Sequence, residues 1–282
     1  EMFVFVLFAM VVAASRYGRR AWRLLGLAPL SVRQAALIAV LSLPLSFACG
    51  RLHHWCLAAW KALGQHVPIL WQLEQFETMD AIRSFSETTP WPALLLLLAA
   101  APAFGEELMF RGVIGTGLVA RRGIVGGILL TSLLFAGVHM HPAHAVALIP
   151  LAVFLHLVYL ATHSLWAPIW LHFLNNAIAV SVLKTSEVGA GGELTADMDW
   201  PLAVTVLAIV SSLALGRWIW QTRIQFVLPD GTLWNPGYVS AERPPRDLQT
   251  VVQPGRPAMS TALVAVVTVA AFLVLASVSL VA

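Results

Sequence analysis

Two carboxylates and a guanidinium lie inside a hydrophobic stretch long enough to cross a membrane. Residues 102–111 include Glu106, Glu107 and Arg111. A charged side chain at the middle of a bilayer costs at least about 2.5–3.5 kcal/mol, so three of them need partners, water or a function. On a helix, Glu107 and Arg111 share one face by their i,i+4 spacing, whereas Glu106 points to another face. Arg111 can therefore neutralise Glu107 and leave Glu106 available for another role.

Two further groups of polar residues lie in separate hydrophobic stretches. Phe135 and His139 share a helical face by the i,i+4 spacing. His172 is followed by Asn175 and Asn176, and spacing alone does not decide which amide lies beside the imidazole. With the carboxylates, these groups supply a base, two imidazoles and an amide. Such a set could deprotonate a water molecule and donate hydrogen bonds to the oxyanion that forms when the water attacks a carbonyl.

A third pattern could bind a metal ion. His139, His141 and His144 form a His-x-His-x-x-His sequence, and imidazole is a common ligand of transition metals. Pro142 interrupts any helix at this point, so the three histidines would not share a regular face. A metal site on these residues is therefore an alternative to the water-activating set, and the main expectation is that no cofactor is bound.

The composition is that of a membrane protein. The 282 residues are 59% hydrophobic and only 11% charged, and the mean hydropathy is +0.80. These values exclude a soluble domain of this size. Backbone polar groups in lipid must be satisfied internally, so we predict an all-α fold, a polytopic transmembrane bundle of about eight helices. The expected spans are 2–14, 34–50 with an extension toward 60, 91–120, 123–140, 145–161, 166–183, 201–219 and 258–282.

The distribution of charge predicts the topology. The loop 15–33 carries five arginines and no acid, and Arg121 and Arg122 mark a second basic turn. Both are expected to be cytoplasmic by the positive-inside rule, whereas the acidic stretch 72–89 is expected to lie at the outer surface. This pattern suits a bacterial inner membrane. The basic residues are not interleaved with stacking aromatics, so nucleic acid is not an expected partner.

The chain is expected to have three parts. Residues 1–90 hold the N-terminal spans and the outer segment, residues 91–183 form the catalytic helical core, and residues 184–282 hold the C-terminal spans. The last part includes a cytoplasmic loop at 221–257. Within it, the alternating residues 224–234 surround an Asp-Gly turn and predict a small hairpin before the last span.

The depths of the polar residues in the membrane set a geometric condition. At about 1.5 Å per residue, Glu106 and His139 both lie about 22–26 Å from the inner surface. His172 lies only about 12 Å above the turn at 161–164 on the same scale. For the three side chains to meet, that turn must be recessed into the protein or the helices must be strongly tilted.

The three motifs resemble those of a known family. Glu-Glu-x-x-x-Arg, Phe-x-x-x-His and His-x-x-x-Asn occur in this order on successive hydrophobic stretches, as in the CPBP family. That family includes type II CAAX prenyl endopeptidases and bacterial Abi or bacteriocin-processing proteases. The resemblance covers roughly residues 99–182. It implies that Glu106 activates the catalytic water, while Glu107 and Arg111 orient the site and balance its charge.

The resemblance also assigns the remaining positions. His139 matches the histidine of the second motif, and His172 with Asn176 matches the third, so the resemblance prefers Asn176 over Asn175. Phe135 and Asn175 are expected to be supporting residues. The motifs contain one amide and no third imidazole or thiolate, which makes tightly held zinc the less natural interpretation. The resemblance therefore implies a glutamate-type protease.

These observations together predict an intramembrane endopeptidase. Its expected partners are the lipid bilayer and a membrane-anchored peptide or protein, cleaved near a membrane-embedded or lipid-modified segment. A proton- or cation-coupled transporter is the first alternative, because buried acids and histidines also relay protons. A non-catalytic membrane scaffold of the same fold is the second. Inverted repeats with broken helices would favour transport, and the sequence shows none.

Overall fold

The chain is represented by a computed structural model, which describes residues 24–76, 79–185, 200–237 and 239–281, together with 7, 10–12, 14, 15 and 18. Much of the expected first span, 2–14, lies outside the described residues. From α3 onward the elements are α3 (Val32–His66), η2 (Pro68–Phe76), α4 (Met79–Thr88), α5 (Trp91–Leu94), η3 (Leu95–Ala100), α6 (Ala101–Glu107), η4 (Leu108–Gly115), α7 (Thr116–Gly137), α8 (Pro142–Thr162), α9 (Trp166–Thr185), α10 (Leu202–Gln221), β1 (Ile224–Val227), β2 (Val251–Pro254) and α11 (Met259–Val281).

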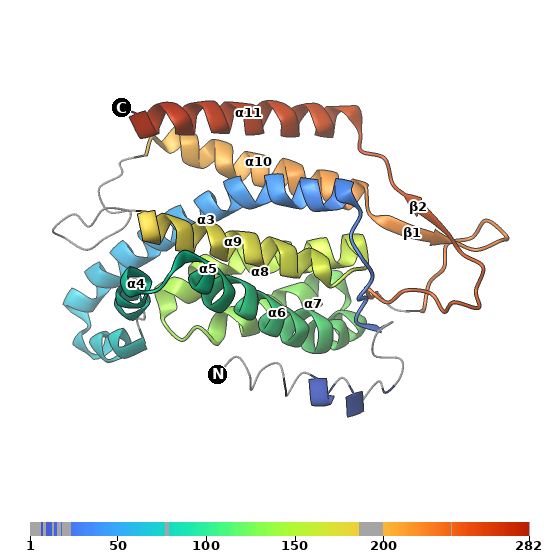
Figure 1. Cartoon of the computed structure of the whole chain (residues 1–282), viewed down its shortest axis with the longest axis horizontal. Coiled ribbons are helices and arrows are strands. Elements are labelled where there is room, and N and C mark those ends of the chain that lie inside the picture. The colour runs from blue at the N-terminus through green and yellow to red at the C-terminus, as the bar shows by residue number, and fades with distance from the viewer. Residues whose placement is uncertain are drawn as a thin grey trace.

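The predicted all-α membrane bundle is confirmed. Within the described part of the chain, six helical runs are long and apolar enough to cross a membrane. They are Val32–His66, Trp91–Gly137, Pro142–Thr162, Trp166–Thr185, Leu202–Gln221 and Met259–Ser279. Figure 1 shows α3 between α10 and α9, with α11 on the far side of α10.

The longest run, Trp91–Gly137, is divided by a glycine. Gly123 has φ 73° and ψ −178°, which is outside the helical region and is readily adopted only by glycine. Beyond the break, the chain packs back on itself, because Gly127 lies directly against Val119 and leaves no room for a Cβ atom. The run therefore forms two packed helical segments, in agreement with the separate spans expected at 91–120 and 123–140.

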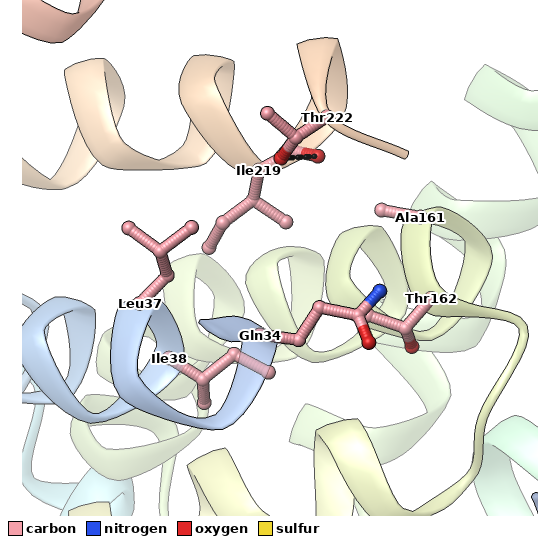
Figure 2. A pocket seen from close by; sticks show the side chains of 7 residues that line it. All are labelled: Gln34, Leu37, Ile38, Ala161, Thr162, Ile219 and Thr222. Carbon is pink, nitrogen blue, oxygen red and sulfur yellow. Dashed lines mark hydrogen bonds between the residues drawn. The ribbon is translucent and has the colours of Figure 1, made fainter. Parts of the chain in front are cut away.

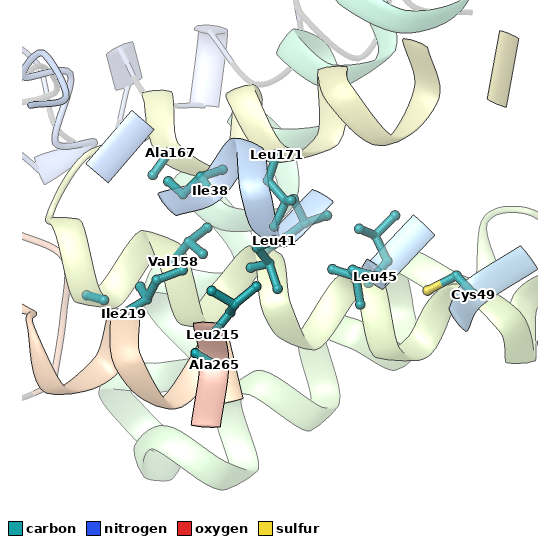
Figure 3. Close-up of a cluster of buried hydrophobic side chains, with 13 residues drawn as sticks. Ile38, Leu41, Leu45, Cys49, Val158, Ala167, Leu171, Leu215, Ile219 and Ala265 are labelled. Carbon is teal, nitrogen blue, oxygen red and sulfur yellow. The ribbon is translucent and has the colours of Figure 1, made fainter. Parts of the chain in front are cut away.

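Close packing of aliphatic side chains joins the central helices. Leu41 of α3, Leu155 of α8, Leu171 of α9 and Leu215 of α10 belong to one buried cluster, which Figure 3 shows in part. Lipid tails are as apolar as leucine, so van der Waals packing has to hold such helices together in a membrane. This cluster fixes α9 against α3 and α8.

The hairpin that begins with β1 differs from its prediction. The expected turn is present, with Gly231 at φ 85° and the Leu228 amide donating to Thr232 O at 2.8 Å. However, β1 pairs with β2 in an antiparallel ladder, while the expected second strand makes only an isolated bridge through Leu233. Pro236 follows this bridge and has no amide proton for a ladder. The strand that completes the ladder is therefore Val251–Pro254.

The turn between α8 and α9 is buried beneath residues 24–28. The Leu165 amide donates to Gly26 O at 2.9 Å, and Ser164 Oγ donates to Ala28 O. Gly26 has φ 60°, and a Cβ atom there would lie 2.9 Å from His163 O. The turn is thus recessed into the protein, which meets the depth condition for His172 to reach the same level as Glu106.

The segment around Arg243, in the loop between β1 and β2, covers the same turn. Arg243 Nε donates to His163 O at 2.9 Å, and its Nη2 donates to Thr162 O at 3.5 Å. His163 Nδ1 donates to Glu242 O at 3.2 Å. Burial lowers the pKa of His163, so its ring is neutral at pH 7. The loop between β1 and β2 therefore covers the end of the helix pair that carries His172.

A small cavity lies beside this turn. It has room for about one water molecule, with a volume of about 10 Å³. Figure 2 shows that its lining comes from the neighbouring ends of α3, α8 and α10. The lining residues are Gln34, Leu37, Ile38, Ala161, Thr162, Ile219 and Thr222. The cavity is a packing gap between helix ends, too small for an organic substrate.

We expect Arg243→Ala to lower the thermal unfolding temperature of the protein in detergent. The substitution leaves the carbonyls of Thr162 and His163 without their charged donor, at a cost of about 1–2 kcal/mol once partial exposure of Arg243 is considered. Arg246→Ala is the matched control, because Arg246 is an exposed arginine of the same loop. Equal losses in the two variants would contradict this role of Arg243.

Candidate active site

The ion pair expected between Glu107 and Arg111 is present and fully buried. Glu107 Oε1 accepts from Arg111 Nη1 at 2.7 Å and from His172 Nδ1 at 2.8 Å. Arg111 Nη2 also donates to Ala152 O of α8 at 3.1 Å. A buried charge needs such a counter-charge and hydrogen bonds to offset its lost hydration. These contacts join η4, α8 and α9 around one carboxylate.

Glu106 has different surroundings. Its side chain is 17% exposed, and its Oε2 atom is 4.0 Å from His172 Nε2. This oxygen is buried and has no hydrogen-bond partner among the residues that the structure describes. His172 Nδ1 donates to Glu107, so in a neutral ring the lone pair of Nε2 faces Glu106. His172 therefore lies between an engaged carboxylate and an unengaged one.

The helix that carries both glutamates is not a regular α-helix. Wide π-helical turns, η3 and η4, flank the short α6, and Pro102 lies inside α6. The Thr116 hydroxyl lies 2.9 Å from Arg111 O and 2.6 Å from Gly112 O, so it contacts two carbonyls of the widened turn. The assumed uniform spacing of 100° per residue is therefore wrong here. Such π-turns occur frequently at functional sites.

Phe135 links the remaining groups. Its fully buried ring lies 5.2 Å from the ring of His139 and 5.8 Å from that of His172, measured between centroids. The Arg111 guanidinium carbon lies 4.5 Å from the centroid of the same ring, at a distance suited to a cation–π interaction. Phe110 packs edge-on against it at 5.3 Å. Phe135 thus holds both imidazoles and the arginine in fixed positions.

His139 is placed by an irregular turn between α7 and α8. Met140 has φ 62°, a left-handed conformation that is uncommon for a residue other than glycine. His139 Nδ1 donates to Phe135 O at 2.9 Å, because a carbonyl can only accept. In the neutral ring, Nε2 is then an acceptor.

The two asparagines have different neighbours. Asn175 Oδ1 accepts from Ser46 Oγ of α3 at 2.8 Å. Asn175 Nδ2 donates to Asn176 Oδ1 at 3.4 Å. Asn176 is four residues after His172, so the two share a face of α9, while Asn175 is turned toward α3. Ser46 has no motif around it in the sequence, and only the packing of α3 against α9 places it here.

The alternative metal ligands do not form one group. The ring of His144 lies 5.3 Å from that of His139 and 5.2 Å from that of His53, between centroids. The ring of His141 instead packs on Trp60 at 5.6 Å, because His141 precedes the first turn of α8. In the described part of the chain, no group of three or more His, Cys, Asp or Glu could hold a metal ion. The approach of His53, from α3, was not predictable from spacing.

Comparison with known proteins identifies the region around the site. Residues 88–178 match the model of the family described as type II CAAX prenyl endopeptidase Rce1-like, in agreement with the resemblance of the motifs. This stretch is about a third of the chain and contains every expected site residue from Glu106 to Asn176. No curated protein and no solved structure matches the chain. The family match supports a membrane endopeptidase in general terms.

Proposed function

Because residues 88–178 match an endopeptidase family, we propose that the chain hydrolyses a peptide bond within the membrane with Glu106 as the general base. The contrast between adjacent glutamates carries this proposal. Glu107 accepts hydrogen bonds from Arg111 and His172 through Oε1, although its Oε2 has no partner in the described ranges, whereas Glu106 has no such bond there and its buried Oε2 faces an imidazole. A carboxylate that no cation or donor holds can take a proton from water.

The distance between Glu106 and His172 suits one water molecule. Glu106 Oε2 and His172 Nε2 are 4.0 Å apart, and both are acceptors when the ring is neutral. If a water oxygen lay about 2.8 Å from both atoms, the Oε2–water–Nε2 angle would be about 90°, close to the angle between the two O–H bonds of water. The water would donate one proton to each atom and direct a lone pair toward the substrate carbonyl. His139 Nε2 is also an acceptor in the neutral ring, so it could hold this water only in place of one of these two acceptors, because the water has two protons to donate.

The reaction then needs only protons from the water. The water oxygen bonds to the carbonyl carbon while one of its protons passes to Glu106. Asn176 Nδ2 donates to the oxyanion that forms, which is a role suited to a fixed amide. The carbon–nitrogen bond breaks, and Glu106 returns the proton to the departing amine. Glu107, Arg111 and Phe135 hold His172 in place throughout.

The location of the site suggests the kind of substrate. Glu106 and His172 lie within apolar helical runs that are long enough to span a bilayer. A peptide segment that is already in the membrane, or tethered to it by a lipid, reaches such a depth without transferring a polar chain from water. We therefore propose a membrane-anchored peptide or protein as substrate. The bacterial inner membrane is the proposed location, because the arginine-rich cytoplasmic loops suit it.

The experiment uses the purified protein in liposomes with two reporters, a prenylated peptide ending in a CAAX sequence and an unprenylated transmembrane peptide. We expect cleavage of at least one reporter, with a rate that EDTA does not change. Cleavage that EDTA abolishes and zinc restores would favour a metal-dependent hydrolase and overturn the proposed role of Glu106. Solute flux across the liposome with neither reporter cleaved would instead favour the transporter.

A further inference from the structure

A chain of hydrogen bonds connects α3 to the candidate active site. Ser46 Oγ donates to Asn175 Oδ1 at 2.8 Å, and Asn175 Nδ2 donates to Asn176 Oδ1 at 3.4 Å. All three side chains are half-buried. Ser46 lies outside the residues that match the endopeptidase family, so neither the motifs nor the match assigns it a role.

Resting on the function proposed above, we propose that Ser46 is a positioning residue that directs the amide of Asn176 so that Nδ2 faces the reacting carbonyl. An asparagine amide has an acceptor end and a donor end of nearly equal size, so its hydrogen bonds decide which end points where. Ser46 donates to the acceptor end of Asn175, which turns the donor end of Asn175 toward Asn176. The acceptor end of Asn176 is then engaged, and its donor end remains for the substrate.

This direction matters for the reaction. An oxyanion attracts an N–H donor and repels a carbonyl oxygen, so an amide in the opposite orientation would oppose the transition state. A donor that already points correctly needs no reorganisation when the charge develops, which is the main benefit of a fixed oxyanion site. The helix geometry separates the roles of the two amides. Asn176 shares a face of α9 with His172, whereas Asn175 is turned toward Ser46.

The chain offers a matched control for Ser46. Ser42 lies one turn earlier on α3 and is buried, but its hydroxyl donates within its own helix to Ala39 O at 2.8 Å. Ser42→Ala and Ser46→Ala therefore remove the same group from the same helix. Only the second substitution removes a contact with α9. Ser46→Thr keeps the hydroxyl and serves as the conservative variant.

The first measurement is kcat and KM for whichever of the two reporters the wild-type protein cleaves. We expect Ser46→Ala to lower kcat about 3–10-fold and to leave KM within about twofold, because only the transition state uses the donor. Ser46→Thr should restore most of kcat, and Asn175→Ala combined with Ser46→Ala should cost no more than either alone. An equal fall in kcat for Ser42→Ala, or a change confined to KM, would overturn the proposal.

The second measurement does not depend on activity. With ¹⁵N-labelled asparagine in micelles, Ser46→Ala should shift the side-chain amide signals of both Asn175 and Asn176, and Ser42→Ala should leave them in place. Unchanged signals in Ser46→Ala would overturn the relay directly. A failure of the proposed function would give a different result. Full activity of Glu106→Gln would contradict the role of Glu106 in activating water, but it would leave these amide signals unchanged.

Discussion

Glu106→Gln is expected to lower kcat for peptide cleavage by about 10²–10⁴-fold, the usual contribution of a general base. Glutamine has the same shape but cannot accept a proton from water. The folded protein should keep the unfolding temperature of the wild type, because Glu106 Oε2 has no hydrogen-bond partner to lose within the described residues. Cleavage in liposomes and thermal unfolding in detergent measure the two effects separately.

Glu107→Gln is the matched control for this prediction, because it makes the same change at the next residue. Here the loss should be mainly in stability, since Glu107 Oε1 holds both Arg111 and His172. Wild-type cleavage by a folded Glu106→Gln protein would contradict Glu106 as the base. A folded but inactive Glu107→Gln protein beside an active Glu106→Gln protein would exchange the roles of the two carboxylates.

Arg111→Met should be strongly destabilising, with a loss of about 3–5 kcal/mol in the free energy of unfolding. The substitution leaves the carboxylate of Glu107 buried without its counter-charge, and it removes the contacts of the guanidinium with Ala152 O and the Phe135 ring. Methionine fills much of the same volume, so a cavity contributes little. Unfolding by denaturant in detergent gives the value.

The double variant Glu107→Gln with Arg111→Met tests whether charge is the cause. With neither charge present, much of the stability lost in each single variant should return, since replacing a complete buried ion pair is often nearly neutral. Cleavage should not return, because His172 Nδ1 would have an amide in place of its carboxylate partner. Additive losses in the double variant would show that packing, rather than an unpaired charge, explains the single substitutions.

Much of the fold was predictable because its signals are local. An apolar run of about 20 residues between charged loops predicts a spanning helix wherever it occurs. The observed α8, α9, α10 and α11 therefore agree closely with the expected spans. The pairing of Glu107 with Arg111 was also predictable, because residues four apart stay close enough to pair even though η4 departs from the regular α-helical spacing.

The errors arose where distant segments decide the structure. The partner of β1 is Val251–Pro254, and neither the turn at Gly231 nor the alternation around it carries that information. The π-turns on either side of α6 also escaped prediction. Whether a turn is α-helical or π-helical depends on which groups, such as the Thr116 hydroxyl, form hydrogen bonds with the backbone carbonyls. The spacing of the apolar residues does not contain that information.

By itself, the sequence determined that this is a membrane helical bundle with costly charges at its centre, because the composition of each stretch sets the energy of placing it in lipid. Only the tertiary structure decided that the α8–α9 turn is buried, that Ser46 reaches Asn175, and that His172 lies between Glu106 and Glu107. These are contacts between helices. They depend on the relative depth and rotation of packed helices, which no single stretch of sequence specifies.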